Sequence, residues 1–494
     1  APREIDMSRK LPPPPPAPSK PSRPPGDAMA RLLAGTLRTG FGHDQAAVFD
    51  ESESIGSPRG WIPSRNVAID RAVGSALPGG RIIEVYGANS SGKSTVADQI
   101  GAQCQAMGGL YAVADVERNR DRRYMQAIGV SMQTALWLGG NTVELLFEEI
   151  ELLARFSASG NLVAWKQALD LAGYKTPALP SYDHQTYDPY LRKAERKKKP
   201  VASFTLYDWS MDHSAALAEY QAASGLVRTG TTDIATREAL RPVVVYDASG
   251  AVYTGDTRST EFRSAREALL AGEQPDGGWT GHVADRPIVA CWDSIGGTTT
   301  QAEIEDGAGD PHPGRAAQAI KRNMRRLVTL FDQALLTLVV VNQEYTKIDM
   351  GGGPPRPGVG PKKDTYGGDG IKYHSCIRML IERTGKIMAS SAEDAAQIGQ
   401  TCDVLVVKNK VAAPFRREEF GLIYGRGAEN AFTIYHDLKR RGIIVQKGGW
   451  SQFTDPTVAP ALGSFRGWQD LANGMAADPG LYVKLAGIYF EATK

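Results

Sequence analysis

The chain has 494 residues, of which 42% are hydrophobic, so it can bury a substantial core, and we expect two or three domains. The 57 Lys and Arg residues nearly balance the 55 Asp and Glu residues, so overall charge excludes neither nucleic acid nor other partners, and any DNA partner must be recognised by local basic clusters. The four cysteines stand singly, which argues against a zinc or disulfide framework and fits a reducing cytoplasm. Because the sequence has no apolar run of ~18 residues and begins with a Pro-rich segment, we expect neither a membrane span nor a signal peptide.

The first 66 residues are expected to lie outside the main core. Residues 1–27 are rich in proline and predict an extended, flexible tail. Residues 28–37 predict a short amphipathic helix, which can pack on its own domain.

A phosphate-binding loop is predicted between a buried strand at 81–86 and a helix at 95–106, because the intervening residues fit the pattern G-x-x-x-x-G-K-[ST]. Glycines let the backbone wrap a polyphosphate, and the N–H groups at the helix start donate to it. Lys93 supplies a mobile cation for the β- and γ-phosphates of ATP, and the Ser94 hydroxyl stands where Mg²⁺ would bind. The expected nucleotide-binding residues are Gly87, Ala88, Asn89, Ser90, Ser91, Gly92, Lys93, Ser94 and Thr95.

The next predicted strand, residues 110–117, ends with two carboxylates. If the extended conformation continues to its end, alternation places Asp115 and Glu117 on the same side. One of them could orient a water molecule for attack on a γ-phosphate, or both could be a solvated strand end.

A helix is predicted over 142–155. It is followed by a long intervening segment, residues 158–286. Its basic run at 192–199 fits a DNA-facing patch and a solvated linker equally well. Residues 214–224 look helical, and 243–253 predict a hairpin closed by Ser-Gly.

Two further strands carry charged residues. The apolar run 288–293 ends in Asp293, a candidate Mg²⁺ ligand beside the loop at 87–94. In the strand 403–410, Lys408 and Lys410 are two residues apart and face the same way, which suits either an anion held between them or a solvated edge.

Several of these motifs, in this order, resemble the RecA recombinase family. The resemblance rests on seven segments: Tyr86 to Ser94, Ala114 to Glu117, Asp121 to Tyr124, Asp293 to Ser294, Val341 to Gln343, Gly367 to Tyr373 and, above all, Val406 to Phe415. It covers roughly residues 28–157 and 287–490 and implies a divergent member from a bacterium or a phage. Two departures affect rate and nucleotide preference: Asn89 replaces the usual acidic residue, and Arg118 follows Glu117.

The resemblance assigns roles to individual residues. It implies that Glu117 activates water, that Asp121 and Tyr124 meet the adenine, and that Gln343 senses the γ-phosphate. It also implies that Lys408 and Lys410 reach the γ-phosphate held by the neighbouring protomer. Those two lysines, Lys93, Glu117 and Gln343 form the predicted catalytic set, and Ser94 and Asp293 form the predicted metal site.

DNA contacts are expected from two irregular loops, at 303–314 and about 349–369, and from the helix between them. Their cations can follow a single strand electrostatically, although any one loop lysine can instead be merely solvated. The predicted DNA-binding residues are Arg322, Arg325, Arg356, Lys362, Lys363, Gly367, Gly368 and Lys372.

The predicted fold class is α/β: a RecA-like P-loop ATPase core with a central, largely parallel sheet flanked by helices. The core occupies 67–157 and 287–430, after an oligomerisation helix and linker at 28–66 and before a small C-terminal α/β domain at 431–494. The expected activity is that of a DNA-dependent ATPase and recombinase, using ATP and Mg²⁺, which assembles as a helical homo-oligomer on single-stranded DNA and pairs it with double-stranded DNA in the cytoplasm. A loader or single-strand-binding protein is an expected partner. A hexameric DNA motor and a non-catalytic DNA-binding paralogue are the alternatives.

Overall fold

The computed structural model describes residues 58–174, 181–187, 200–207, 239–249, 251–306, 314–346, 363–390 and 394–491, with a few isolated residues between 178 and 224. The predicted tail at 1–27, the helix at 28–37 and the basic run at 192–199 lie outside these ranges.

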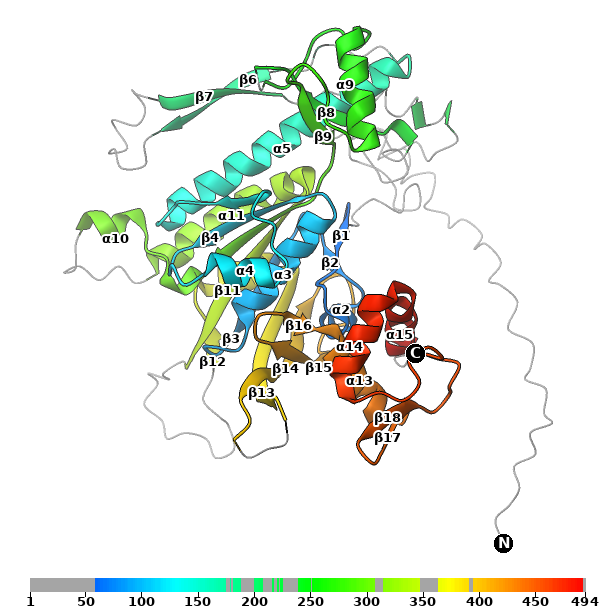
Figure 1. The fold of residues 1–494 in the computed structure, drawn as a ribbon. Coiled ribbons are helices and arrows are strands. Elements are labelled where there is room, and N and C mark those ends of the chain that lie inside the picture. Colours follow the sequence, from blue (N-terminus) through cyan, green and yellow to red (C-terminus); the bar gives the residue numbers. More distant parts are fainter. Residues whose placement is uncertain are drawn as a thin grey trace, which may run out of the picture.

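A large mixed sheet forms the centre of the molecule (Figure 1). β3, β4, β5, β10, β11 and β13 run parallel where they pair, whereas β14, β15 and β16 continue the sheet antiparallel. This confirms the predicted α/β class. In spatial order the strands are β16 (Gly427–Glu429), β15 (Arg417–Ile423), β14 (Gln397–Asn409), β13 (Ile377–Met388), β3 (Ile82–Gly87), β11 (Leu336–Thr346), β10 (Ile288–Asp293), β4 (Leu110–Asp115) and β5 (Ala135–Trp137).

Both faces of the sheet are buried, and side-chain alternation assigns successive residues to opposite faces. On β10, for example, Val289 and Cys291 join one apolar cluster, while Ala290 and Trp292 join the other. α2 (Val67–Val73), α3 (Lys93–Ala106) and α13 (Asn430–Arg440) pack in the first cluster; α5 (Val143–Leu171) and α11 (Arg315–Ala334) cover the second.

The insertion begins within a continuous helix. The sequence predicts a helix ending near residue 155, but α5 runs for 29 residues, so the expected boundary at 157/158 lies inside it. Trp165 and Leu169 on its second half are buried in the insertion's own small cluster, which explains why the helix continues. The helix therefore carries the insertion away from the sheet (Figure 1).

The remaining insertion elements are β6 (Ser181–Tyr187), β7 (Pro200–Tyr207), β8 (Val243–Tyr246), α9 (Thr260–Ala271) and β9 (Thr280–Val283). The predicted hairpin at 243–253 is only partly correct, because β8 pairs along its length with β9 and meets the predicted partner only at the Tyr246–Val252 bridge. Most of the predicted helix at 214–224 lies outside the described residues.

The C-terminal segment forms a small α/β unit that shares the main core. β17 (Ile444–Lys447) and β18 (Trp450–Phe453) form a hairpin, followed by α14 (Gly467–Ala477) and α15 (Pro479–Glu491). The Arg71 guanidinium of α2 lies 3.7 Å from the ring centroid of Tyr489, which joins this unit to the core.

Short elements flank the carboxyl ends of the strands. They are α4 (Arg122–Ala127), the 3₁₀ turn η2 (Ile295–Gly297), α10 (Gln301–Asp306), β12 (Lys363–Thr365) and α12 (Gly368–His374); the two-residue strands β1 (Trp61–Ile62) and β2 (Leu77–Pro78) pair separately. The loop expected at 303–314 thus starts inside α10. The loop expected at about 349–369 is closed by β12, which pairs with the end of β11, and by the start of α12.

Candidate nucleotide-binding site

The phosphate-binding loop lies between β3 and α3, as predicted. Gly87 has φ of +150°, and a Cβ there would come within 2.2 Å of the Ile381 carbonyl oxygen. Gly92 has φ of +94°, and a Cβ there would meet Leu422 at 2.4 Å. Both positions therefore require glycine for the loop to wrap as it does.

Unsatisfied donors line this loop. The N-cap of the 14-residue helix α3 is Gly92, which gives the first helical turn no side-chain cap. The Ser91 hydroxyl is buried and has no hydrogen-bond partner. Lys93 donates to the Ala88 carbonyl oxygen at 2.7 Å, and burial lowers its pKa although nearby carboxylates oppose this shift. A polyphosphate would accept from the uncapped N–H groups of the first helical turn and from Lys93, so the loop fits a nucleotide.

Ser94 and Asp293 meet at the carboxyl end of β10. The Ser94 hydroxyl donates to Asp293 Oδ2 at 2.5 Å. Within the described residues no group of three or more His, Cys, Asp or Glu side chains could enclose a metal ion. A Mg²⁺ ion at this pair would take its other ligands from phosphate and water, which is its usual mode with nucleotides.

Glu117 does not lie on the same strand face as Asp115, which the alternation of an extended strand predicts. β4 ends at Asp115, which turns inward and accepts from the Arg120 amide, and the chain turns before Glu117. The two carboxylates are therefore not neighbours on one strand face. Glu117 Oε1 instead accepts from the Ser294 hydroxyl and from Gln343 Nε2, the latter at 3.3 Å.

Gln343 is placed by sheet register, because it lies opposite Gly87 where β11 pairs with β3. The neighbouring Asn342 donates to the buried Glu84 at 2.9 Å and to the Tyr366 carbonyl oxygen at 2.8 Å. Glu84 also pairs with Arg378 of β13. The end of β11 is thus hydrogen-bonded both to the strand before the phosphate loop and to the chain just before α12.

A cavity of about 310 Å³ adjoins the loop, and Thr95 and Tyr124 from the predicted set line it. Asp121 does not; its carboxylate caps α4 by accepting from the Tyr124 amide at 2.8 Å. Four further lining residues, from β13 to just after β15, belong to no local motif in the sequence: Arg383, Gln400, Leu422 and Tyr424.

Lys408 and Lys410 lie at the end of β14, with Lys410 just beyond it. The pairing of β13 with β14 shifts register between Arg378–Lys408 and Met379–Val406, so Val407 is the extra residue of a bulge just before Lys408. Lys408 donates to the carbonyl oxygens of Lys372 and Tyr373, at 2.5 and 3.0 Å. Burial and the charge of Lys410 both lower the pKa of Lys408.

The predicted DNA-binding residues are only partly described. Arg322 and Arg325 are exposed on α11. Gly367 and Gly368 both have positive φ at the start of α12. Lys372 pairs with Asp364 and Asp369, so its charge is largely compensated. Arg356, Lys362 and the side chain of Lys363 lie outside the described residues.

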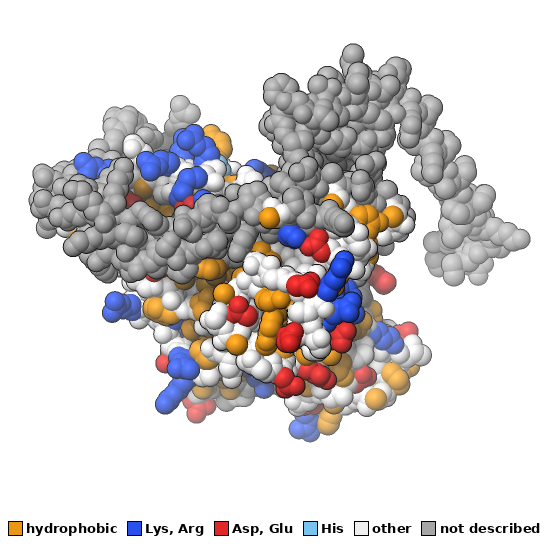
Figure 2. Space-filling view, turned by 90° about the horizontal axis from the view of Figure 1, so that it is seen from above, with side chains coloured by type: hydrophobic (Ala, Val, Ile, Leu, Met, Phe, Trp, Pro, Cys, Tyr) orange, Lys and Arg blue, Asp and Glu red, His pale blue; other side chains and the backbone are white. Residues whose placement is uncertain are grey.

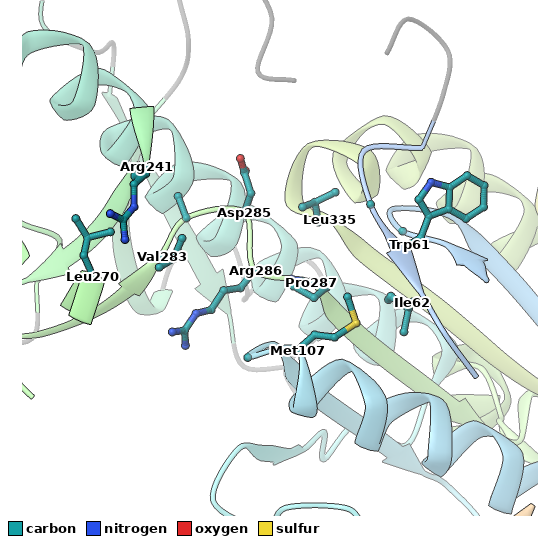
Figure 3. A pocket seen from close by; sticks show the side chains of 14 residues that line it. Trp61, Ile62, Met107, Arg241, Leu270, Val283, Asp285, Arg286, Pro287 and Leu335 are labelled. Atoms are coloured by element: carbon teal, nitrogen blue, oxygen red, sulfur yellow. The ribbon is translucent and has the colours of Figure 1, made fainter. Parts of the chain in front are cut away.

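A second cavity, of about 700 Å³, lies at the other edge of the sheet (Figure 3). It is lined by Met107, Pro287 and Leu335, which precede β4, β10 and β11, and by insertion residues that include Arg241 and Arg286. On the insertion side of the molecule, acidic and basic side chains are interspersed over the described surface (Figure 2). The phosphate-binding groups are all at the opposite, carboxyl edge.

Comparison with known proteins agrees with this geometry. The family described as the RecA N-terminal domain matches residues 39–165 and 285–429, on either side of the insertion. Protein RecA of Solidesulfovibrio magneticus is 24% identical over 88% of this chain and 84% of its own length. The identity is 25% with Protein RecA of Trichodesmium erythraeum, over 81% and 72%, and 24% with that of Nocardia farcinica, over 86% and 82%. No helix in the described ranges has the length and apolar character to cross a membrane.

Proposed function

Because the chain belongs to the RecA family, we propose that it is an ATP-dependent DNA recombinase that forms helical filaments on single-stranded DNA and promotes homologous pairing and strand exchange. The observation that carries the proposal is the meeting of Lys93, the Ser94–Asp293 pair and the Glu117–Gln343 pair at one edge of the sheet. These groups would supply the phosphate-binding cation, the metal site and the water-orienting carboxylate that ATP hydrolysis uses.

In the proposed mechanism the phosphate loop binds ATP through backbone N–H groups, and Lys93 moves from the Ala88 carbonyl oxygen to the β- and γ-phosphates. A bound Mg²⁺ would neutralise charge on the β- and γ-phosphate oxygens, held through Ser94 and Asp293. Glu117 accepts a hydrogen bond from the attacking water and orients it toward the γ-phosphorus. Tyr124 stacks on the adenine, and Asp121, beside it, accepts from the adenine amino group.

Gln343 would couple the nucleotide to DNA. It contacts Glu117 directly, and β11 continues three residues beyond it to Thr346, which pairs with Lys363 of β12. Asn342 holds the chain just before α12 through the Tyr366 carbonyl oxygen. A shift of Gln343 toward a γ-phosphate would therefore be felt by both segments that flank the proposed DNA loop at 349–369.

The DNA-facing set in this proposal comprises the exposed arginines of α11, the loop lysines and the glycines at the start of α12. Lys408 and Lys410 act in trans on the γ-phosphate of the neighbouring protomer, and residues 28–37 contact that neighbour. The protein would work in the cytoplasm of a bacterium or a phage-infected host, with a loader or a single-strand-binding protein as partner. The insertion has no role in this mechanism.

Electron microscopy of the protein with single-stranded DNA and a non-hydrolysable ATP analogue tests the assembly. Helical filaments support the recombinase, whereas closed rings would indicate a hexameric motor on the same fold. ATPase measurements with and without DNA test the catalytic part, and hydrolysis absent under both conditions would indicate a non-catalytic paralogue.

A mixing experiment tests the trans lysines. Lys408→Ala/Lys410→Ala protein and Lys93→Ala protein should each hydrolyse ATP poorly, because one lacks the trans cations and the other an intact phosphate loop. In mixtures, junctions that pair an intact loop with intact trans lysines should restore part of the DNA-dependent ATPase. The recovered activity should depend on the mixing ratio and be greatest when the two proteins are present in equal amounts. Co-assembly without recovered activity would place the lysines in their own subunit, where Lys408 already binds the end of α12.

A further inference from the structure

A buried arginine lies directly behind the pair that would hold Mg²⁺. Arg120 precedes α4, and its side chain is only 4% exposed. Its Nη2 atom is 3.2 Å from Asp293 Oδ2 and 3.2 Å from Asp98 Oδ1. A guanidinium remains charged under all ordinary conditions, so a permanent cation sits between the proposed metal-site carboxylate and a second carboxylate from α3.

The oxygen that Arg120 contacts is also the one that Ser94 uses. Asp293 Oδ2 accepts from the Ser94 hydroxyl at 2.5 Å and from Arg120 Nη2 at 3.2 Å. On the other side, Asp98 Oδ1 accepts from the Tyr111 hydroxyl at 2.5 Å. Asp98 is thus fixed from one side, and the arginine bridges it to the metal-site residue.

Not all donors of the Arg120 guanidinium form hydrogen bonds in this position. Its Nε and Nη1 atoms are buried and have no hydrogen-bond partner among the described residues, while Nη2 contacts both carboxylates and lies 3.3 Å from Cys291 Sγ. A buried arginine placed only for stability would satisfy more of its donors. The arrangement instead divides one cation between two acids, of which one belongs to the proposed Mg²⁺ site.

We propose that Arg120 is a positioning residue that neutralises Asp293 when the site holds no metal and competes with Mg²⁺ for that carboxylate, with Asp98 setting how strongly it competes. The inference rests on the proposed function for the identity of the metal–nucleotide ligand. Arg120 and Mg²⁺ are both attracted to Asp293 and repel each other, so the arginine weakens Mg²⁺ binding. Mg²⁺ would then bind only together with the phosphates, whose negative charge also attracts it, and Arg120 would shift toward Asp98.

Two substitutions should move the Mg²⁺ requirement in opposite directions. Asp98→Asn removes the competing acid, so Arg120 pairs more fully with Asp293, and the free Mg²⁺ needed for half-maximal binding of a fluorescent ADP analogue should rise. Adding Arg120→Met to that variant removes the cation and should lower this concentration by about tenfold relative to Asp98→Asn. The comparison uses the double variant because Arg120→Met alone leaves Asp98 buried without its cation.

The matched control is Arg71→Met/Glu418→Gln, which removes another mostly buried arginine–carboxylate pair away from the phosphate loop. It should change the melting temperature and leave the Mg²⁺ requirement at the wild-type value. If Arg120 had a purely structural role, the Asp98 and Arg120 variants would likewise change the melting temperature and keep the wild-type Mg²⁺ requirement. Equal Mg²⁺ requirements in Asp98→Asn and the double variant would therefore overturn the inference. Nucleotide binding, and so the proposed function, would remain intact in that case.

A second readout needs no nucleotide. Mg²⁺ at matched ionic strength should raise the melting temperature of nucleotide-free Arg120→Met/Asp98→Asn protein, but not that of wild type, and Asp293→Asn should abolish the rise. If wild type failed to bind the ADP analogue but this rise were present, the proposed function would fail and the inference would stand. Equal melting responses in wild type and the double variant would contradict the inference.

Discussion

The two ends of the parallel strands carry different kinds of side chain. Lys93, the Ser94–Asp293 pair and the Glu117–Gln343 pair gather at the carboxyl ends of β3, β4, β10 and β11. At the amino ends, a cavity of about 700 Å³ with largely apolar walls separates the sheet from part of the insertion (Figure 3). Changes at the first edge should therefore alter chemistry with little effect on stability, and changes at the second should do the reverse.

The largest expected effect is at the carboxyl edge. Glu117→Gln should retain ATP binding and lower the rate of hydrolysis by about 10²- to 10⁴-fold, because the amide still accepts a hydrogen bond but no longer takes a proton. Lys93→Ala should instead lose tight ATP binding. Binding and turnover are measured separately, with a fluorescent nucleotide and by phosphate release.

The matched change at the amino edge is Asp332→Asn, which breaks an ion pair with Arg81 just before β3. It should leave both binding and turnover at the wild-type values. Normal turnover in Glu117→Gln, or a large loss of ATP binding or turnover in Asp332→Asn, would contradict the assignment of chemistry to the carboxyl edge alone.

At the carboxyl edge, the sequence predicted those site residues that belong to one short, continuous motif. The phosphate loop occupies consecutive residues, so its spacing alone reveals it. The Arg120–Asp293 contact joins residues 173 positions apart, and the Asn342–Glu84 contact joins residues 258 apart, so no local pattern marks either pair. They form only because β3, β4, β10 and β11 are adjacent in the sheet.

The amino edge and the insertion were predicted less well for a related reason. A helix was expected to end near residue 155, since the sequence there does not reveal that Trp165 is buried against insertion residues. β8 pairs with β9 across a separation that includes α9, whereas a short Ser-Gly turn favours a local hairpin. Tertiary contacts outweighed the local sequence preference in both places.

The second largest effect should be at Asp285, where the insertion returns to the sheet. Its carboxylate accepts from Trp165 Nε1 at 3.0 Å and pairs with Arg59, and its backbone has φ of +58°. Asp285→Ala would leave the indole donor unsatisfied and strain the backbone, lowering the free energy of unfolding by about 2–3 kcal/mol.

Asp285→Asn is the milder control, because Asn tolerates positive φ and can still accept a hydrogen bond. Chemical denaturation measures both variants, and nucleotide affinity should be unchanged in each. A loss of nucleotide affinity in Asp285→Ala would show that the two edges are coupled.

A smaller effect is expected from His282 of β9. Burial lowers its pKa to about 4, and the charge of Arg286 adds to this shift. The unfolded chain therefore takes up the proton first as the pH falls below about 6.5, so stability is lost progressively between pH 6.5 and 4. At pH 5 the loss should be about 2 kcal/mol relative to pH 7.5.

His282→Gln should remove this part of the acid sensitivity, as measured by denaturant unfolding at the two pH values. ATP binding at pH 7.5 should be the same in the variant and in wild type. An unchanged pH dependence in His282→Gln would mean that the imidazole is solvated in the native protein.

The smallest expected effect concerns α11, where adjacent arginines differ in their partners. Arg326 pairs with Glu151 of α5, whereas Arg325 has no carboxylate partner among the described residues. If α11 faces DNA, only an uncompensated arginine releases a full counterion on binding. Arg322→Ala/Arg325→Ala should therefore reduce the slope of log affinity against log salt by about 1.4 for single-stranded DNA, that is, about 0.7 for each charge.

Arg326→Ala should change the slope little, and so should Lys372→Ala, because Asp364 and Asp369 already compensate that lysine. Equal slopes in Arg322→Ala/Arg325→Ala and wild type would move the DNA path away from α11, and a larger change for Lys372→Ala would mean that its acidic partners leave it when DNA binds.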